Sequence, residues 1–479
     1  MKRILQTLLL LCLSAVSINT VFAQGYRIEV KIEGMKDTSA YLAHYFDGRI
    51  FADDTTRLDH TGKGVFTKKE RLPQGIYVLY LPNQKYFDLL IGEDQDFSIR
   101  TNPEDFIGSM KIDGAKETEG FHGFQQFMKS QNENSKKLQE EYKAQKDSPG
   151  AKKKYQEAFK KADQQVRDYI DQLEKDFPSP SFLSRFALFT LSPDIPDFSK
   201  TVPQETKDRD KEIQRKAYYY NRTHYFDHTD FADDRFLRTP LLKNKLEHYF
   251  SKMLIQNPDT VYHEATKIIE KARPNKDCFQ YIVQYALNNA IQSKIMGMDA
   301  AFVKIAKRYY LSGEATWADS TLMANIRERV FNLQFNLIGE KSHDLKLETI
   351  DGEFVSLHET DAAYTVLYFW EPNCGHCKKA TPRLKKEIYD NFHDKGVKVF
   401  AVYTQDKKEE WEEFVSEHNL FDFINCYDPN FHSNFRIYYD IHSTPAVYLL
   451  DKNKNIIAKR IDIDTLKEFL NHELISKKN

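Results

Sequence analysis

The sequence predicts a multidomain protein in three parts: an N-terminal all-β, sandwich-like domain over residues 24–115, a central α-helical domain over 116–336, and a C-terminal α/β domain over 337–479. Three observations lead to this prediction. At 479 residues the chain is too long for a single hydrophobic core. Short alternating segments fill the first part, and helical periodicity fills the second. Strands and helices alternate in the third.

Residues 1–23 have the three parts of a secretory signal peptide. Lys2 and Arg3 form a basic start, an apolar stretch follows, and Val21-Phe22-Ala23 offers a cleavage site before Gln24. The apolar stretch is shorter than a membrane-spanning helix requires. We therefore expect cleavage and export to the periplasm rather than retention as an anchor.

Charge and cysteine content exclude several classes of protein. Lys and Arg number 69 against 71 Asp and Glu, so no excess of positive charge indicates nucleic acid as a partner. The chain has only five cysteines, too few to hold an exported protein of this length together by disulfides. The hydrophobic cores must therefore hold the fold, which leaves the cysteines available for chemistry.

The first predicted domain is built from short strands. Residues 26–32 and 39–45 alternate polar and apolar side chains at a period of two, and residues 76–81 and 97–100 supply further strands. Turns rich in glycine separate them. This pattern predicts a small antiparallel sandwich. Nothing in it groups catalytic residue types, so we interpret it as a packing or docking module.

The second predicted domain begins with a helical hairpin. Apolar residues recur every three or four positions from Tyr155 to Phe177, and Ser148-Pro149-Gly150 interrupts the charged stretch 129–176. The apolar stripe favours packing within the chain, although a coiled-coil dimer stays open. Further helices are expected over residues 258–272, 277–296, 300–311 and 317–332.

In the last predicted domain, strands and helices alternate along the chain, as in βαβ units. We expect strands over residues 353–357, 365–370, 397–403, 423–427, 446–450 and 456–461, and helices over residues 374–389, 408–418 and 464–474. Pro382 is expected to kink the first of these helices, because it lacks a backbone N–H and clashes with the preceding turn.

Two cysteines mark the start of that first helix, in the stretch Trp370-Glu371-Pro372-Asn373-Cys374-Gly375-His376-Cys377. At a helix N-terminus, the dipole and unpaired backbone N–H groups favour the Cys374 thiolate, which is the nucleophilic form. Cys377 lies three positions later on the same face, within reach for a disulfide. A zinc site would need two more ligands, and covalent haem attachment would need a histidine where Lys378 stands. The pair therefore predicts dithiol–disulfide chemistry, with no metal or bound cofactor.

Residues 338–479 resemble a thioredoxin-fold domain of the thiol-disulfide oxidoreductases, in the periplasmic cytochrome-maturation-type or redoxin group. Three features match in order: a strand ending in Phe369-Trp370, then Cys374-Gly375-His376-Cys377, then Ser443-Thr444-Pro445 before another strand. The whole chain is similar to exported multidomain proteins of this kind from Bacteroidetes. The resemblance over residues 24–335 is weaker and implies little about chemistry.

The resemblance implies roles for particular residues. Cys374 is expected to attack a client disulfide, and Cys377 is expected to resolve the mixed disulfide. Pro445 corresponds to the family's cis-proline, which would leave the Thr444 backbone free to pair with an extended substrate. The alternative for Pro445 is an ordinary trans proline at the start of a strand.

Two neighbouring residues are expected to tune this chemistry or position a client. A partly charged His376 would stabilise the thiolate and make the couple more oxidising, unless its ring simply faces solvent. Trp370 is expected to pack either beside the active site or in the hydrophobic core.

The proton route departs from the family pattern at Tyr368. Many thioredoxins carry a buried acid at this place, which relays a proton to the resolving cysteine. Tyrosine is a poor base near neutral pH. We therefore expect Glu371, or water, to take over that role. Cys278 and Cys426 lie on apolar segments and are expected to be buried and inert.

The sequence thus predicts an exported enzyme that exchanges disulfides with protein clients and is recycled by a redox partner protein. A thiol peroxidase is a second hypothesis, but Glu371 stands where such an enzyme needs a threonine. A third hypothesis is a scaffold or binding protein with an accessory redox domain. Membrane association, the number of subunits and the direction of electron flow stay open.

Overall fold

The computed structural model describes residues 25–474, which divide between Met253 and Leu254 into two compact units. The predicted signal peptide lies outside the described residues. The predicted domain limits at residues 115 and 336 stay predictions. Within residues 25–474, no helix combines the length and the apolar content needed to cross a bilayer.

The strand-rich part of the first unit forms two sheets that share one core. Its strands are β1 (Tyr26–Ile32), β2 (Ser39–Phe46), β3 (Arg49–Arg57), β4 (Lys63–Lys68), β5 (Gly75–Tyr80), β6 (Tyr86–Ile91), β7 (Asp96–Thr101) and β8 (Lys111–Asp113). The sheet orders are β4-β1-β7-β8 and β3-β2-β5-β6, and buried side chains of both sheets pack together. This confirms the sandwich-like prediction. The expectation of a purely antiparallel arrangement is wrong, because β1 pairs in parallel with β7. Period-two alternation reveals a strand but not the direction of its partner.

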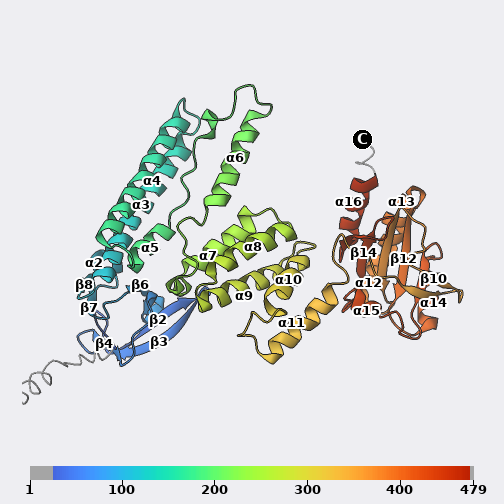
Figure 1. The fold of residues 1–479 in the computed structure, drawn as a ribbon, viewed down its shortest axis with the longest axis horizontal. Coiled ribbons are helices and arrows are strands. Elements are labelled where there is room, and N and C mark those ends of the chain that lie inside the picture. The colour runs from blue at the N-terminus through green and yellow to red at the C-terminus, as the bar shows by residue number, and fades with distance from the viewer. Residues whose placement is uncertain (1–24, 475–479) are drawn as a thin grey trace, which may run out of the picture. The chain divides into compact units, whose positions relative to one another are not determined.

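Long helices follow in the same unit. They are α3 (Lys116–Gln145) and α4 (Ala151–Asp176), and the shorter helices and turns are η1 (Pro82–Gln84), α2 (Phe106–Ser109), α5 (Phe182–Phe189), η2 (Phe198–Lys200), α6 (Arg209–His224), η3 (Asp234–Arg238), α7 (Leu241–His248) and η4 (Tyr249–Met253). Figure 1 shows α3 and α4 lying side by side as the predicted hairpin. Phe127 of α3 stacks on Tyr169 of α4 with ring centroids 4.0 Å apart. The apolar stripe of α4 therefore packs within the chain.

The second unit begins with helices and ends with the α/β domain. Its helices and helical turns are α8 (Pro258–Ala272), α9 (Lys276–Gln292), α10 (Asp299–Ile305), η5 (Ala306–Tyr310), α11 (Ser320–Leu333), α12 (Gly375–Arg383), η6 (Leu384–Tyr389), α13 (Asp390–Phe392), η7 (His393–Lys395), α14 (Lys408–Glu417), α15 (Phe435–Tyr438) and α16 (Ile463–Leu474). Its strands are β9 (Lys346–Thr349), β10 (Phe354–Ser356), β11 (Tyr364–Trp370), β12 (Val397–Tyr403), β13 (Ile424–Tyr427), β14 (Ala446–Leu450) and β15 (Ile456–Lys459).

These strands form one seven-stranded sheet with the order β10-β9-β13-β12-β11-β14-β15. Strands β11, β12 and β13 are parallel, whereas β14 runs antiparallel to β11. Val366, Tyr368 and Trp370 of β11 face a core that includes side chains of α12, α14 and α16. Leu367 and Phe369 face a second core on the other side. Because β11 is buried on both faces, it reads as a continuous apolar run.

Several elements were not predicted, among them β3, β4 and β6 of the first unit and β9 and α15 of the second, and the helix predicted over residues 374–389 is interrupted. Strand β9 and helix α15 have four residues each, too few to show a periodic pattern. The helix expected over residues 374–389 is regular only to Arg383, and the wider turn η6 follows it. Pro382 lies at this transition, which fits the disturbance expected of a proline inside a helix.

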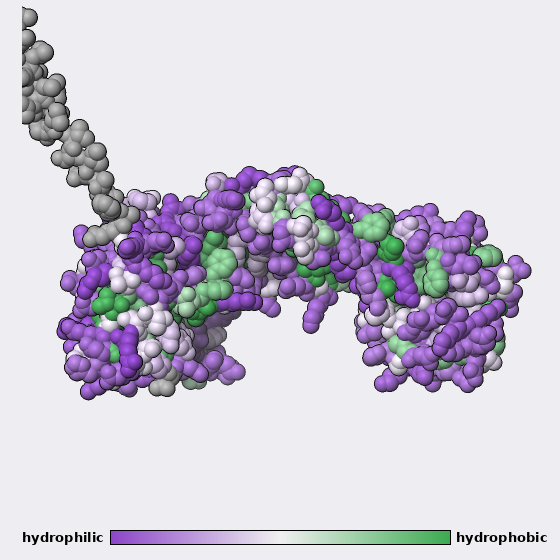
Figure 2. All heavy atoms as spheres, turned by 90° about the horizontal axis from the view of Figure 1, so that it is seen from below, coloured by the Kyte–Doolittle hydropathy of each residue, from purple (hydrophilic) through white to green (hydrophobic). Residues whose placement is uncertain are grey.

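Most exposed residues are polar, in agreement with the high content of charged residues in the sequence. Figure 2 shows that the face in view is mostly hydrophilic, with hydrophobic residues in small separate areas. Charged residues make up 29% of the chain, and most apolar side chains lie in the cores instead. The sequence is thus consistent with globular units that each bury their own apolar surface.

Candidate redox site

Cys374 caps the N-terminus of α12. Strand β11 ends at Trp370 and α12 begins at Gly375, so the chain turns at the carboxyl end of the sheet. The Cys374 sulfur accepts a hydrogen bond from the backbone N–H of Cys377 at 3.3 Å. Both cysteines are free thiols. The geometry thus places the first sulfur where a helix N-terminus offers unpaired donors to an anion.

The pKa of the Cys374 thiol is lowered below its usual value. Burial is the largest influence and acts to raise it, but hydrogen bonds from Cys377, Thr444 and the backbone of His376 outweigh burial. One contact favours the protonated form instead, because the carbonyl oxygen of Thr444 accepts a hydrogen bond from the Cys374 thiol at 3.2 Å. The balance favours the thiolate, which is the reactive form.

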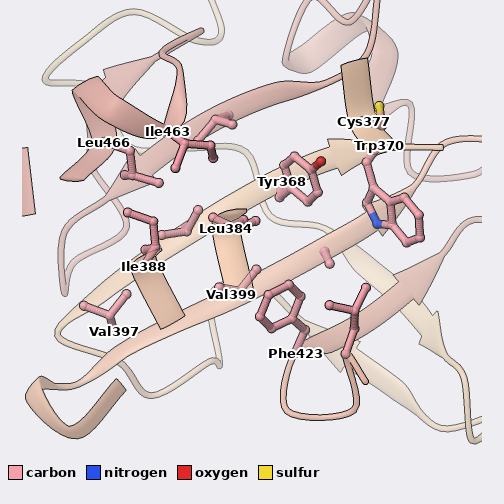
Figure 3. Close-up of a cluster of buried hydrophobic side chains, with 14 of the residues drawn as sticks. Tyr368, Trp370, Cys377, Leu384, Ile388, Val397, Val399, Phe423, Ile463 and Leu466 are labelled. Carbon is pink, nitrogen blue, oxygen red and sulfur yellow. The ribbon is translucent and has the colours of Figure 1, made fainter. Parts of the chain in front are cut away.

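Cys377 lies in a different environment only three residues away. Its side chain is fully buried, and burial raises the pKa of its thiol to about 12. Cys377 belongs to the same buried cluster as Tyr368 and Trp370 of β11, and Figure 3 shows it beyond the Tyr368 ring, toward the end of β11. The environment therefore favours the thiolate form of Cys374, whereas Cys377 is buried and its thiol stays protonated.

The loop before β14 approaches the sulfurs from the other side. The Thr444–Pro445 peptide bond is cis. The Thr444 hydroxyl donates a hydrogen bond to Oε1 of Glu371 at 2.8 Å, and Oε2 of Glu371 accepts one from Gln405. The structure thus brings Thr444, Pro445 and Glu371 to the cysteine pair. The roles of these residues stay predictions.

The other two predicted residues lie on opposite sides of the site. His376 is exposed on the first turn of α12, with no side-chain contact that would fix its ring. Trp370 is fully buried and packs on Phe414 at a centroid distance of 4.9 Å. Its side chain therefore lies in the hydrophobic core, and its role in the site stays a prediction.

A cavity of about 460 Å³ opens beside the cysteines. It is bounded by α12, the loop that leads into β14, and the turn between β15 and α16. The apolar residues in its wall include Pro445, Val447 and Ile463, and basic residues at its edge include His376 and Lys379.

A buried charge cluster at the back of this cavity was not predicted. The Asp440 carboxylate is fully buried and pairs with Arg329 of α11 at 3.1 Å, with His442 at 2.7 Å and with Arg460. The sequence does hold a signal, because Asp440 stands between the apolar residues Tyr439 and Ile441. A charged residue in such a setting is rarely buried without partners.

Gln405 was also missed, although it could have been found. It follows β12, which runs parallel to β11. Residues after the ends of neighbouring parallel strands lie side by side. Gln405 therefore had to lie near Glu371, which follows β11.

Among residues 25–474, the two other cysteines are buried, as expected. Cys278 lies in α9 and Cys426 in β13, and burial raises the pKa of the Cys426 thiol well above its usual value. In the part of the chain that the structure describes, no group of three His, Cys, Asp or Glu side chains is arranged to hold a metal ion.

Comparison with known proteins places this site in a family. Residues 338–459 match the AhpC/TSA family. The curated protein thiol-disulfide oxidoreductase ResA of Oceanobacillus iheyensis is 26% identical over 141 residues, which make up 28% of this chain and 71% of that relative. The C-terminal domain belongs to the thioredoxin-like thiol-disulfide oxidoreductases. The resemblance predicted from its motifs is thereby confirmed, and the chain is an oxidoreductase of several domains.

The parts ahead of this thioredoxin-like domain match families without an assigned role. Residues 26–121 match a domain of unknown function, DUF4369, and residues 200–336 match another, DUF5106. These matches add no chemistry to the helical and strand-rich parts.

Solved structures are also similar to parts of this chain. A domain of a possible thiol-disulfide isomerase from Cytophaga hutchinsonii is 39% identical, with 30% of this chain and 96% of that chain covered and a TM-score of 0.28. A thioredoxin-like protein from Bacteroides caccae is 20% identical, with 58% of this chain and 97% of that chain covered and a TM-score of 0.45.

Proposed function

We propose that this oxidoreductase exchanges disulfides with protein clients through Cys374 and Cys377. The observation that carries the proposal is the contrast between the two thiols. Cys374 is partly exposed with a lowered pKa, whereas Cys377 is buried with a pKa of about 12. Cys374 is thus suited to attack a client disulfide, and Cys377 is protected until the mixed disulfide between Cys374 and the client has formed.

The exchange can be written as two substitutions at sulfur. The Cys374 thiolate attacks a client disulfide, forms a mixed disulfide and releases one client thiolate. Cys377 then attacks the Cys374 sulfur and releases the second client thiolate, so two electrons pass to the client. The products are a Cys374–Cys377 disulfide and a reduced client. The reverse sequence oxidises a client dithiol. Only the two sulfurs change, so we expect no bound cofactor.

Client binding would use the cavity beside Pro445. This cavity of about 460 Å³ is large enough for a few side chains but not for a folded domain. We therefore expect clients to present an extended or unfolded segment. His376, at the cavity edge, would raise the oxidising power of the couple by stabilising the thiolate.

We also propose that the protein is exported, because residues 1–23 have the features of a signal peptide. An oxidising compartment outside the cytoplasm contains disulfide clients, and a separate redox partner protein would recycle the enzyme. Cell fractionation would test the location, and mass spectrometry of the recovered protein would show whether residues 1–23 have been removed.

Reduction of insulin disulfides tests the chemistry. Cys374→Ser should abolish turnover, because serine cannot form a mixed disulfide. Cys426→Ala is the matched control, since it removes a buried cysteine outside the pair, and it should keep the activity. Unchanged turnover by Cys374→Ser would refute the proposal. A thiol peroxidase would instead consume peroxide faster than it reduces insulin.

A trapping experiment separates an enzyme from a scaffold. Cys377→Ala leaves the first attack intact but removes resolution, so clients should accumulate as mixed disulfides on Cys374. Reducing agent should release them. A scaffold with an accessory redox domain would retain partners without any covalent bond to Cys374.

A further inference from the structure

The second substitution requires a proton acceptor for Cys377. Its thiol is fully buried and has a raised pKa, so it keeps its proton until it attacks. On the core side, its neighbour Tyr368 shares a hydrogen bond of 2.8 Å with Thr381, and burial raises the pKa of the tyrosine. The indole of Trp370 carries only a donor. The residues beneath Cys377 therefore offer no base.

The opposite side of the sulfurs has a suitable group. The Thr444 carbonyl oxygen accepts a hydrogen bond from the Cys374 thiol at 3.2 Å, and hydrogen bonding with the Thr444 side chain acts to lower the pKa of the Cys377 thiol. The Thr444 hydroxyl also donates to Oε1 of Glu371 at 2.8 Å. A hydroxyl can accept one proton while it donates another, so it can link a thiol to a carboxylate.

Three strands of the sheet hold this link in place. Glu371 follows β11, Gln405 follows the parallel strand β12, and Thr444 precedes β14. The Gln405 amide donates to Oε2 of Glu371, which leaves Oε1 directed at Thr444. The carboxylate is therefore held by neutral hydrogen-bond donors on both oxygens and keeps a fixed orientation.

We propose that the Thr444 hydroxyl relays the proton between Cys377 and Glu371 during resolution of the mixed disulfide. This inference rests on the proposed disulfide exchange and adds the proton path to it. The route replaces the buried acid that stands at the position of Tyr368 in many thioredoxins.

The step balances in atoms and electrons. As the Cys377 sulfur bonds to the Cys374 sulfur, the bond from Cys374 to the client sulfur breaks, and the client thiolate leaves with the electron pair. The Cys377 proton passes to the Thr444 oxygen, and the Thr444 hydroxyl proton passes to Glu371. Because the proton departs while the new S–S bond forms, a buried free thiolate is never required. Release of the proton from Glu371 to water resets the path.

Rapid-mixing kinetics with acid quenching can separate the two steps. The full-length enzyme is mixed with a peptide disulfide, and mass spectrometry follows the mixed disulfide on Cys374. Thr444→Val keeps the shape but removes the hydroxyl, and Glu371→Gln keeps the hydrogen bond but cannot take a proton. Both variants should slow decay of the mixed disulfide by roughly 10²-fold, as for other positioned proton transfers, while its formation changes little. Thr444→Ser should restore the decay rate.

A solvent deuterium isotope effect distinguishes a relay from support of the loop. The wild-type decay should slow in D2O, and Thr444→Val should lose this effect. Thr381→Val is the matched control, because it removes a hydroxyl from the core side of the site and should leave decay unchanged. Equal decay in the wild type and Thr444→Val, or slow decay in Thr381→Val alone, would overturn the relay. Absence of any mixed disulfide in the wild type would instead refute the proposed exchange.

Discussion

At the scale of single residues, position on the helix decides which sulfur reacts. Cys374 occupies the cap of α12, where backbone N–H groups stabilise a negative charge, and Cys377 lies one turn deeper in the core. Both have the same side chain, so their chemical difference comes entirely from hydrogen bonding and burial. The local sequence predicted the reactive thiolate of Cys374, because this depends on where the helix begins, but it did not predict the burial of Cys377, which depends on how α12 packs against the core.

The pH dependence of alkylation tests the lowered pKa of Cys374. Iodoacetamide reacts with thiolates, whose fraction rises as the pH increases through the pKa. The reaction rate at Cys374 should therefore reach half its maximum below pH 8.5, which is about the pKa of an ordinary cysteine. Cys377 should stay unmodified, because its thiol is buried and its pKa is about 12. Peptide mass spectrometry gives both rates, and a midpoint for Cys374 above that of free cysteine would contradict the assignment.

The link from Glu371 to Thr444 could be predicted only in part. Proximity of Glu371 to the cysteines follows from the sequence, because only two residues separate it from Cys374. Thr444 is far away along the chain, and its hydroxyl reaches Glu371 only because β14 pairs with β11. The motif resemblance placed Thr444 beside the sulfurs but did not show what its side chain binds.

At the scale of elements, buried strands were predictable and short elements were not. Strand β14 is a continuous apolar run and β12 is interrupted only by Lys398, and the predicted limits of both agree with the structure. Strand β9 depends on pairing with β10 and β13, so its existence is decided by partners and not by its own residues. The same applies to the loop around Asp440, whose backbone has a φ of 49°.

Substitution of Asp440 tests how much this loop depends on its charge cluster. Asp440→Ala should lower the free energy of unfolding by about 1–3 kcal/mol, because it leaves the half-buried Arg329 and Arg460 without their carboxylate partner. Urea unfolding measures the change. Asp464→Ala is the control, since it breaks the exposed pair with Arg383 and should cost at most about 1 kcal/mol. Equal effects of the two substitutions would show that the cluster contributes no special stability.

At the scale of the whole molecule, the second unit joins helices to the thioredoxin-like domain. The Lys459 ammonium is buried and binds Asp299 together with the backbone and side chain of Asn336. Arg329 of α11 reaches Asp440. Lys459 and Asp440 of the redox domain thus form ion pairs with residues of helices that precede this domain. The sequence predicted three parts in the right order, but helical periodicity does not reveal which core each helix joins.

Two fragments test this dependence. Residues 254–479 keep the partners of Lys459 and Asp440, whereas residues 337–479 lose Asp299, Asn336 and Arg329. Loss of a partner from a buried ion pair costs about 3–5 kcal/mol, so the shorter fragment should melt roughly 10 °C lower. Thermal unfolding followed by circular dichroism compares them. Equal melting temperatures would show that the redox domain does not need these helices.

The central claim is that Cys374 and Cys377 form one reversible two-electron couple, and a redox titration tests it most directly. The mature protein is equilibrated in glutathione buffers of graded potential, remaining thiols are blocked, and peptide mass spectrometry measures the Cys374–Cys377 disulfide. We predict a single reversible transition with a two-electron slope, in which Cys426 keeps its thiol. If no buffer produces a disulfide between Cys374 and Cys377, or if it forms but cannot be reduced again, the proposed exchange is wrong.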